Sequence, residues 1–302
     1  MPMNLISVGE VLWDVIGETE HLGGAPLNFA AHAARLGHGS YLISAVGTDE
    51  RGKRAISKIR ALGLDTEYIR SLPDHPTGYV SVSLDHGGQP CFTIHRPAAY
   101  DFVELTASQL EQLVRTKPGW VYFGTLAQTS SIVRSTTSRV IEVVPSAKRF
   151  YDVNLRTGCY NREVVFHLLS FATVAKLNDL EIGLLENLFG DIHHNRIEDF
   201  CRKCVLRFGW EAACVTRGEK GCALLLGDDY VESAAYPVRV LDAIGAGDAF
   251  AAGLVHALSA GWDAPRAADF ANRLGALVAS RAGAIPAWSL QEAETLPRQS
   301  VL

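Results

Sequence analysis

Several features that would place a chain in a special class of protein are missing from this sequence of 302 residues. No apolar run approaches the roughly 18 residues that a membrane-spanning helix needs, so we expect no membrane partner. Lysine and arginine never form a block, and the formal net charge is −5. A nucleic-acid partner bound through a basic face is therefore not expected. The first residues also lack the basic stretch and apolar core of a secretory signal.

Cysteine is scarce and irregularly placed, with six residues at spacings that match no disulfide framework. Together with the missing secretory signal, this usage predicts a reducing compartment and a cytoplasmic location. Cys201 and Cys204 form one CxxC on a helical pattern, but no second pair of ligands accompanies them. We interpret them as core or surface cysteines rather than as zinc ligands or a redox pair.

The pattern of the chain is that of an α/β protein. Its length is compatible with one domain or two, but no linker or repeat divides it, so we treat residues 1–302 as a single domain. Short apolar strands alternate with helical patterns, which predicts a three-layer α/β/α sandwich around a mostly parallel sheet. The predicted strands are 5–8, 41–46, 120–123, 149–153, 173–177 and 212–216, and the predicted helices are 27–36, 50–62, 130–143, 196–208, 249–260 and 265–280.

Two regions interrupt this alternation, because strand-like segments follow one another there without a helix between them. Residues 11–16 continue from the first strand, and residues 77–85 and 89–96 alternate around a glycine turn at 86–88 like a hairpin. We predict a small separate sheet built from about 11–22 and 77–100. It should form a lid over the carboxyl ends of the parallel strands, where open α/β sheets bind ligands.

The strongest chemical signal is the nonapeptide DAIGAGDAF at 242–250. Gly245, Ala246 and Gly247 form a bend with almost no side-chain bulk before an apolar helix. Several backbone N–H groups should point to one place there, where the helix dipole adds positive potential. Asp248, in the first turn, can simply cap the helix. Beside an anion site it can instead accept the proton of a hydroxyl that attacks a phosphoryl group, and the two glycines favour this interpretation.

Two segments resemble nucleotide-binding loops without completing them. GTDERGKR at 47–54 has the spacing of a P-loop, but Arg54 stands where a Ser or Thr should bind Mg²⁺. We interpret this segment as a turn in which Asp49 caps the next helix. The GAGDAF segment also resembles half a dinucleotide fingerprint. Phe250 occupies its third glycine position, and it does not follow the first strand, so dinucleotide binding is not expected.

Five motifs occur in the order that is typical of one enzyme family: GGAPLN at 23–28, DVNLR at 152–156, KLNDLE at 176–181, VTRGEKG at 215–221 and DAIGAGDAF. They span nearly the whole chain, which resembles the PfkB family of ribokinase-like carbohydrate kinases. The resemblance implies a ribokinase-like fold and transfer of the γ-phosphate of ATP to a sugar hydroxyl. GGAP followed by Asn28 is similar to the fructokinase branch, whereas ribokinases usually carry a GGKGAN-like string and adenosine kinases a GGSxxN-like one.

The resemblance also assigns roles to individual residues, most of which have a simpler explanation. Asp14 could be a solvated strand end, Arg156 a surface ion pair and Glu181 a helix-start acid, while Thr216 and Asn272 could make ordinary core hydrogen bonds. The implied roles are Asp248 as base with Gly245, Ala246 and Gly247 as anion hole, Asp14, Gly24, Asn28, Arg96 and Arg156 at the sugar, Asn178, Thr216, Gly218, Gly221 and Asn272 at the nucleotide, and Glu181 near Mg²⁺.

One position departs from the family pattern. The family usually has Thr after the first Asp of the last motif, and this chain has Ala243. The missing hydroxyl would weaken local ordering or a monovalent-cation (K⁺) site beside the anion hole, while the backbone donors and Asp248 remain. In the family this cation is held largely by carbonyl groups, which here are those of Asp242, Ile244, Val278, Arg281 and Gly283.

Three functions stay open at this point. The first is an ATP- and Mg²⁺-dependent sugar kinase with fructose as its preferred substrate. The second is a kinase for a different substrate, such as 2-keto-3-deoxygluconate, ribose or a nucleoside. The third is a catalytically silent sugar-binding relative, for which Ala243 is the motive. Because relatives often pair through their lids, the resemblance also implies a homodimer through the lid.

Overall fold

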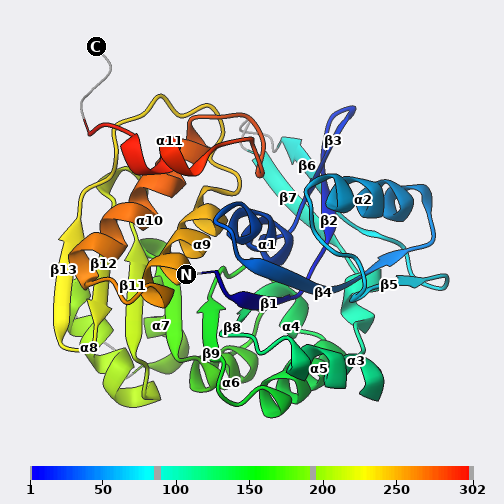
Figure 1. The fold of residues 1–302 in the computed structure, drawn as a ribbon, viewed down its shortest axis with the longest axis horizontal. Coiled ribbons are helices and arrows are strands. Elements are labelled where there is room, and N and C mark those ends of the chain that lie inside the picture. Colours follow the sequence, from blue (N-terminus) through cyan, green and yellow to red (C-terminus); the bar gives the residue numbers. More distant parts are fainter. Residues whose placement is uncertain (1, 85–89, 191–194, 299–302) are drawn as a thin grey trace.

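In the computed structural model, residues 2–84, 90–190 and 195–298 are described. They form a nine-stranded sheet in the order β13-β12-β11-β10-β9-β8-β1-β4-β5 and a separate four-stranded sheet in the order β3-β2-β6-β7 (Figure 1). The strands of the large sheet are β1 (Asn4–Val8), β4 (Gly39–Gly47), β5 (Ile69–Leu72), β8 (Trp120–Gly124), β9 (Lys148–Asp152), β10 (Val174–Asn178), β11 (Ala212–Thr216), β12 (Cys222–Leu226) and β13 (Asp229–Ser233).

The large sheet is mostly parallel, as predicted. From β5 to β11 neighbouring strands run parallel, and only the pairings of β12 with β11 and with β13 are antiparallel. Every strand and helix predicted from the apolar pattern is present, with ends that differ by at most three residues. The antiparallel edge β12–β13 and the opposite edge strand β5 were not predicted.

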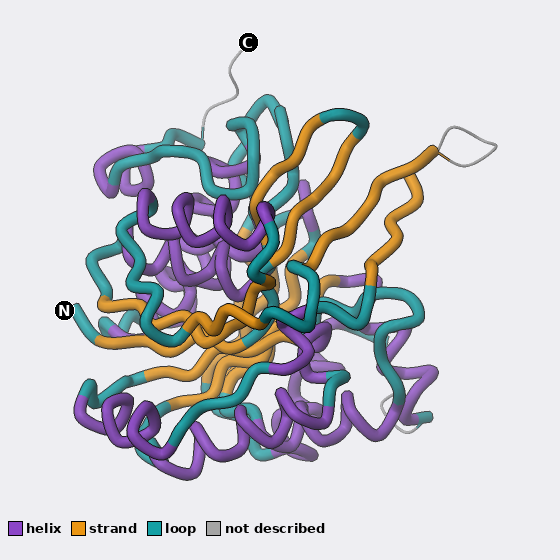
Figure 2. Tube along the Cα trace, turned by 90° about the vertical axis from the view of Figure 1, so that its right-hand side faces the viewer, coloured by secondary structure: helices purple, strands orange, loops and turns teal. Residues whose placement is uncertain are grey.

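Helices cover both faces of the large sheet, so the molecule has three layers (Figure 2). Successive strand residues point to opposite faces. Leu5 therefore packs in the layer of α1, α9 and α10, and Ile6 in the layer of α5 to α8. The helices are α1 (Ala25–Arg35), α2 (Glu50–Ala61), α3 (Ala107–Arg115), α4 (Thr125–Gln128), α5 (Ser131–Val143), α6 (Arg162–Phe171), α7 (Asp179–Phe189), α8 (Ile197–Phe208), α9 (Ala246–Ser259), α10 (Ala264–Ala279) and α11 (Leu290–Thr295), with 3-10 turns η1 (Ala99–Phe102) and η2 (Gly218–Lys220).

The small sheet is separate from the main one, which confirms that part of the prediction. It consists of β2 (Leu12–Ile16), β3 (Thr19–Gly23), β6 (Gly78–Leu84) and β7 (Pro90–His95), and it projects from the body of the molecule (Figure 2). The predicted glycine turn at 86–88 lies outside the described residues. Helix α2 holds this sheet, because the Glu20 carboxylate accepts hydrogen bonds from Arg51 and Arg54, at 2.7 Å for the shortest.

One face of the small sheet carries Asp14, which stands in register with His21 on β3 and Val80 on β6. The opposite face carries Trp13, which packs with the apolar residues of α1 and α2. The Asp14 face is therefore the one left for a ligand. In the part of the chain that the structure describes, none of the helices has the length and hydropathy needed to cross a membrane.

Candidate active site

Helix α9 begins three residues earlier than predicted, at Ala246. Gly245 precedes it in the left-handed region, with φ 79°, and packs so closely against the loop after α10 that a Cβ would lie 2.3 Å from the Ala284 carbonyl oxygen. Glycine is therefore required there. Ala246 and Gly247 belong to the first helical turn rather than to a preceding bend. The Ala246 N–H donates to Ala243 O at 3.3 Å. No side chain caps this turn among the described residues, so the N–H groups of Gly247 and Asp248 stay available to an anion.

The Asp248 carboxylate does not cap its own helix. It is buried, and its Oδ2 atom accepts a hydrogen bond of 2.7 Å from Nδ2 of Asn28 on α1. This bond joins the GGAPLN and DAIGAGDAF motifs, which are 220 residues apart in the sequence. The other amide atom of Asn28, Oδ1, is buried without a partner in the described structure and is available to a ligand.

The environment of Asp248 favours its neutral form. Burial raises the pKa of this carboxyl to about 7, and the nearby charge of Asp152 acts in the same direction. The hydrogen bond from Asn28 and the charges of Lys176 and Arg156 oppose the increase. A carboxylate whose pKa is close to neutrality is well matched to accept and release a proton at ordinary pH.

This pKa predicts how activity depends on pH. We expect kcat/KM to rise between about pH 6 and pH 8 with a midpoint near 7, because only the ionised Asp248 can accept a proton. Initial rates across this range, with ionic strength and free Mg²⁺ held constant, test the expectation. A rate that stays constant through pH 7 would show that Asp248 does not titrate there.

Asp152 and Lys176 form a buried ion pair beside Asp248. The Lys176 ammonium lies 2.9 Å from each Asp152 carboxylate oxygen, and the Tyr122 hydroxyl donates to the same carboxylate at 3.2 Å. The two residues are in register on β9 and β10, so they share a face of the sheet. Sequence reasoning assigned no role to either, although both lie in motifs that carry the resemblance.

Arg156 lies among three carboxylates at the lid side of the site. It is exposed and its side chain makes no hydrogen bond or ion pair with a described residue, yet its charge opposes the increase in pKa that burial causes at Glu10, Asp14 and Asp248. For Glu10 and Asp14, burial outweighs this effect and raises the pKa. An unpaired guanidinium facing these acids is available to an oxygen-rich ligand. The predicted sugar residues Asp14, Asn28 and Arg156 are thus brought around one region.

Gly24 shapes the loop that enters α1. It is the residue before the helix, with φ 115°, and a Cβ on it would lie 2.4 Å from the Glu10 carbonyl oxygen. Glu10 itself is buried, and its Oε2 atom has no hydrogen-bond partner among the described residues. The close approach of Gly24 and Glu10 fixes the start of α1 and hence the position of Asn28.

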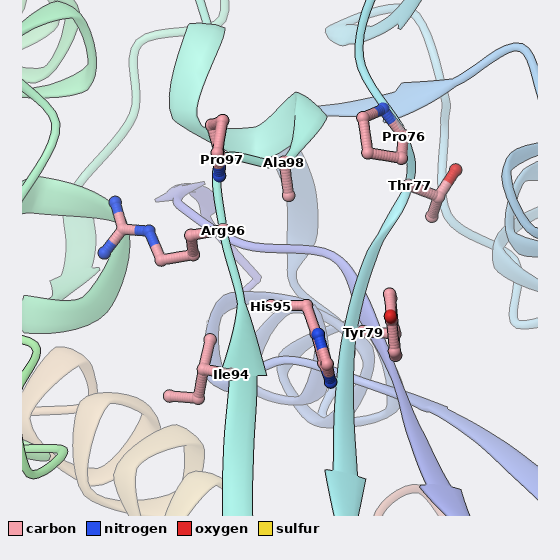
Figure 3. A pocket seen from close by; sticks show the side chains of 8 residues that line it. All are labelled: Pro76, Thr77, Tyr79, Ile94, His95, Arg96, Pro97 and Ala98. Atoms are coloured by element: carbon pink, nitrogen blue, oxygen red, sulfur yellow. The ribbon is translucent and has the colours of Figure 1, made fainter.

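Arg96, which is also predicted at the sugar, makes its contacts with other parts of the chain than Asp14, Asn28 and Arg156 do. It pairs with Asp101, its Nη1 donates to Leu126 O at 3.3 Å, and it also bonds Thr129. A pocket of about 310 Å³ lies at the base of the lid and is lined by Arg96, Thr77 and Tyr79 among others. Figure 3 shows that the Arg96 guanidinium is directed away from Thr77 and Tyr79. In this arrangement the guanidinium fixes the lid to α4 and η1, and its contact with a sugar stays a prediction.

Asn178 and Glu181 cap the start of α7 reciprocally. Asn178 Oδ1 accepts from the Glu181 N–H at 2.9 Å, and Glu181 Oε2 accepts from the Asn178 N–H at 2.8 Å. The second Glu181 oxygen accepts from the Leu155 N–H at 2.7 Å, and burial raises the pKa of this carboxyl. Each oxygen keeps a lone pair, which suits a contact to hydrated Mg²⁺ through water. Within the described residues no group of three His, Cys, Asp or Glu side chains could hold a metal.

The other four residues predicted at the nucleotide lie near the ends of β11 and β13; they are Thr216, Gly218, Gly221 and Asn272. Asn272 on α10 donates to Ser233 O at 3.0 Å, and Gly221, with φ 85°, would place a Cβ 2.0 Å from the same carbonyl oxygen. Thr216 makes a long contact of 3.4 Å to Leu177 O, and Gly218 begins η2 with φ 54°. Asn272 and Gly221 thus fix the chain at the end of β13, and the nucleotide contacts stay predictions.

The carbonyl groups predicted to hold a monovalent cation lie on the loop before α9, on the last turn of α10 and on the loop that follows α10. The Asp242 carboxylate joins these two loops. Its Oδ1 accepts from the Ile244 N–H at 2.9 Å and its Oδ2 from the Gly283 N–H at 3.0 Å. Val278 O already accepts from the Arg281 N–H at 3.0 Å. The juxtaposition of both loops suits carbonyl ligation, with Ala243 in place of the usual threonine. Whether these carbonyls bind K⁺ stays a prediction.

Two simpler interpretations of the sequence are confirmed. Asp49 caps α2 by accepting from the Gly52 N–H at 2.8 Å, as expected for a turn rather than a P-loop. Cys201 and Cys204 are free and buried in the core on α8, and burial raises the pKa of Cys201 to about 12. Thiols of this kind are poor nucleophiles and metal ligands.

The fold is that of the ribokinase-like kinases, and the chain belongs to the pfkB family of carbohydrate kinases, whose profile matches residues 4–290. The protein is therefore a sugar kinase of this family. The fructokinase of Escherichia coli is 30% identical to it over 302 residues, covering 93% of this chain and 94% of that protein. The fructokinase of Salmonella typhimurium is 30% identical over 266 residues, covering 84% and 83%.

Solved structures show the same fold. The structure of a fructokinase with bound ATP from Xylella fastidiosa superposes with a TM-score of 0.85 at 22% identity, covering 98% of each chain. An uncharacterized sugar kinase from Pyrococcus horikoshii superposes with a TM-score of 0.78 at 26% identity, covering 97% of this chain and 99% of that one. The similar proteins thus include fructokinases and a kinase whose name gives no particular sugar.

Proposed function

We propose that this protein is an ATP-dependent fructokinase, with Asp248 as the base. The observation that carries the proposal is the hydrogen bond between Asn28 and Asp248, which places the predicted base at the predicted sugar loop. The GGAPLN sequence of that loop and the fructokinases among its relatives support fructose as the sugar. The proposal includes ATP with Mg²⁺, since related structures contain ATP and Mg²⁺ or fructose, ADP and calcium.

The proposal assigns each part of the reaction to particular groups of the chain. Asn28 orients the Asp248 carboxylate, which accepts the proton of the attacking sugar hydroxyl. The free N–H groups in the first turn of α9 hold oxygens of the transferring phosphoryl group. Asp14 and Arg156 bind the remaining hydroxyls from the lid and from the end of β9. Glu181 would lie near Mg²⁺ bound with ATP, and the ion would neutralise phosphate charge there.

A panel of acceptors tests the substrate. ADP release should be faster with fructose than with ribose, 2-keto-3-deoxygluconate or adenosine. If one of these gives a kcat/KM more than about tenfold above that of fructose, which is about 1.4 kcal/mol of discrimination, the fructose assignment is wrong. No turnover with any acceptor, together with measurable sugar binding, would favour a catalytically silent sugar-binding relative, the alternative that Ala243 suggests.

Variants of the sugar residues test the geometry. We expect Asp14→Ala to raise KM for the sugar by more than about tenfold with little change in KM for ATP, because Asp14 lies on the small sheet and none of the predicted nucleotide residues does. Glu20→Gln is the matched control, since Glu20 is on the same small sheet and contacts α2 instead. Equal changes in both KM values would contradict a sugar-specific role for Asp14.

A further inference from the structure

His32 is a fully buried histidine on α1, and the mechanism above gives it no part. Its Nδ1 atom accepts a hydrogen bond of 3.0 Å from the Trp288 indole N–H, so the proton of the neutral ring is on Nε2. This Nε2–H donates to Ala284 O at 3.0 Å. Both ring nitrogens therefore have partners, which fix the tautomer and the orientation of the imidazole.

The acceptor of the second bond, Ala284 O, lies against the start of α9. It is the oxygen that a Cβ on Gly245 would meet at 2.3 Å. The carbonyl group of Ala284 thus fills the space beside the glycine that precedes α9 in the left-handed region. His32 therefore holds the atom against which the beginning of α9 packs.

Helix α1 reaches the proposed site at two places. Its Asn28 holds the Asp248 carboxylate at 2.7 Å, and α1 and α9 lie side by side (Figure 1). Arg35, near the end of α1, donates to two further carbonyl groups of the loop after α10, those of Pro286 and, at 3.5 Å, Ile285. One helix thus carries the contact to the base and the contacts to the loop behind the anion site. A shift of that loop on α1 would move the two parts of the site relative to each other.

The hydrogen bond of His32 does not depend on pH in the range where Asp248 titrates. Burial lowers the pKa of His32 to about 4, and the charge of Arg35 acts in the same direction, against the bond to Ala284 O. The ring is therefore neutral from pH 6 to pH 8, with its donor on Ala284 O throughout.

We propose that His32 is a positioning residue, which holds Ala284 O against Gly245 and thereby fixes the first turn of α9 relative to the base. The inference rests on the proposed function, in which Asp248 and this turn form the catalytic site. A buried carbonyl group that loses its donor is costly until it finds another. Unpaired N–H groups stand in the first turn of α9, so the freed carbonyl would move toward them and compete with the anion.

Three variants separate the two hydrogen bonds of His32. His32→Leu loses both. In His32→Asn the amide oxygen replaces Nδ1 and can accept from Trp288, but the amide does not reach Ala284 O. In His32→Gln the amide nitrogen replaces Nε2 and restores the donor to Ala284 O.

We expect kcat, per folded protein, to fall by about 10–10²-fold in the Leu and Asn variants of His32, because small displacements of catalytic groups have effects of this size. The Gln variant should stay within about threefold of wild type. KM for the sugar should change by less than about threefold in all three, since its proposed contacts on the lid do not depend on α9, whereas KM for ATP should rise with the loss of the anion site. The rates are measured with the acceptor that gives the fastest turnover, so a wrong fructose assignment does not affect them.

His38→Leu is the matched control. His38 follows α1, is buried, and lies with Nε2 3.0 Å from Nδ1 of His256 in the last turn of α9, so it links the same two helices at the end away from the site. This variant should keep kcat within about threefold of wild type, even if its melting temperature falls as far as that of His32→Leu. An equal loss of kcat would show a general effect of packing between α1 and α9 and would overturn the proposal.

Two other kinetic results would also overturn the proposal: wild-type turnover of His32→Leu, and turnover of His32→Gln as slow as that of His32→Asn. If His32→Leu does not fold, the Asn and Gln variants decide, because both keep a buried amide and differ in its reach. Failure of all three to fold would make His32 a residue of stability rather than of positioning, and would count against the proposal.

Calorimetric titration with inorganic tripolyphosphate separates this inference from the proposed function, since it needs neither sugar nor turnover. Affinity should fall by about tenfold in His32→Leu and His32→Asn and stay unchanged in His32→Gln and His38→Leu. Unchanged affinity in His32→Leu would overturn the role of His32. The expected order of affinities in a protein that phosphorylates none of the acceptors would support His32 as a positioning residue and reject the proposed fructokinase activity.

Discussion

Replacing Asp248 with Asn should lower kcat by about 10²–10⁴-fold, the usual contribution of a positioned general base. The amide keeps the size of the carboxylate but cannot accept the hydroxyl proton. The side chain makes no cap on α9 in the structure, so its replacement removes no capping hydrogen bond. KM for ATP and for the sugar should change much less than kcat. Initial rates, with both ligands also titrated separately, measure these quantities.

The same variant should also change how stability depends on pH. The pKa of Asp248 is raised from 3.8 to about 7, so its contribution to stability is complete below about pH 4 and is lost as the pH rises through about 7. The asparagine variant has no such loss, and its melting temperature relative to wild type should therefore increase from about pH 5.5 to pH 8.5.

Asp263→Asn is the control for the chemical change itself. Asp263 caps α10 by accepting from the Arg266 N–H at 3.0 Å, and asparagine caps a helix about as well as aspartate. This variant should keep both its turnover and its stability. Near-wild-type turnover of Asp248→Asn would instead mean that Asp248 is not the base.

The apolar pattern predicted the centre of the fold better than its edges. β1, β8 and β11 are almost wholly buried and have mostly apolar sequences, which is why they were recognisable. β13 and the lid strand β3 are partly exposed, and their sequences DYVES and TEHLG alternate polar and apolar residues only weakly. Strands of this kind form because neighbouring strands pair with them, and a short stretch of sequence does not show which strands will be its neighbours.

The parts of the candidate site that could be predicted are those whose structure depends only on residues next to one another in the sequence. The glycine before α9 and the capping pair of Asn178 and Glu181 are local features with local signals. The pair of Asp152 and Lys176 is not local, since it depends on the register of β9 and β10 across an intervening helix. Arg96 pairs with Asp101, only five residues later, but this contact depends on the 3-10 turn η1, which was not predicted.

Replacing Gly247 with Ala should separate stability from activity. Gly247 is inside the first turn of α9, where alanine is favoured over glycine by roughly 0.5–1 kcal/mol. The added Cβ would contact only the Lys176 ammonium among described atoms, at an ordinary distance of 3.4 Å. The melting temperature should therefore stay the same or rise. Turnover should fall on the order of 10²-fold, because the methyl group would obstruct the approach of phosphate to the N–H groups that are proposed to bind it.

Gly183→Ala is the matched comparison for this change. Gly183 is inside α7, and a Cβ there would meet nothing within 4 Å, so the variant gains the same helix propensity without covering a site. It should be as stable as Gly247→Ala and fully active. Thermal melting and kcat of both variants, measured side by side, give the comparison. If Gly247→Ala is stabilised and also keeps wild-type turnover, phosphate does not approach α9 at Gly247, and the anion site must lie elsewhere along the carboxyl edge of the sheet.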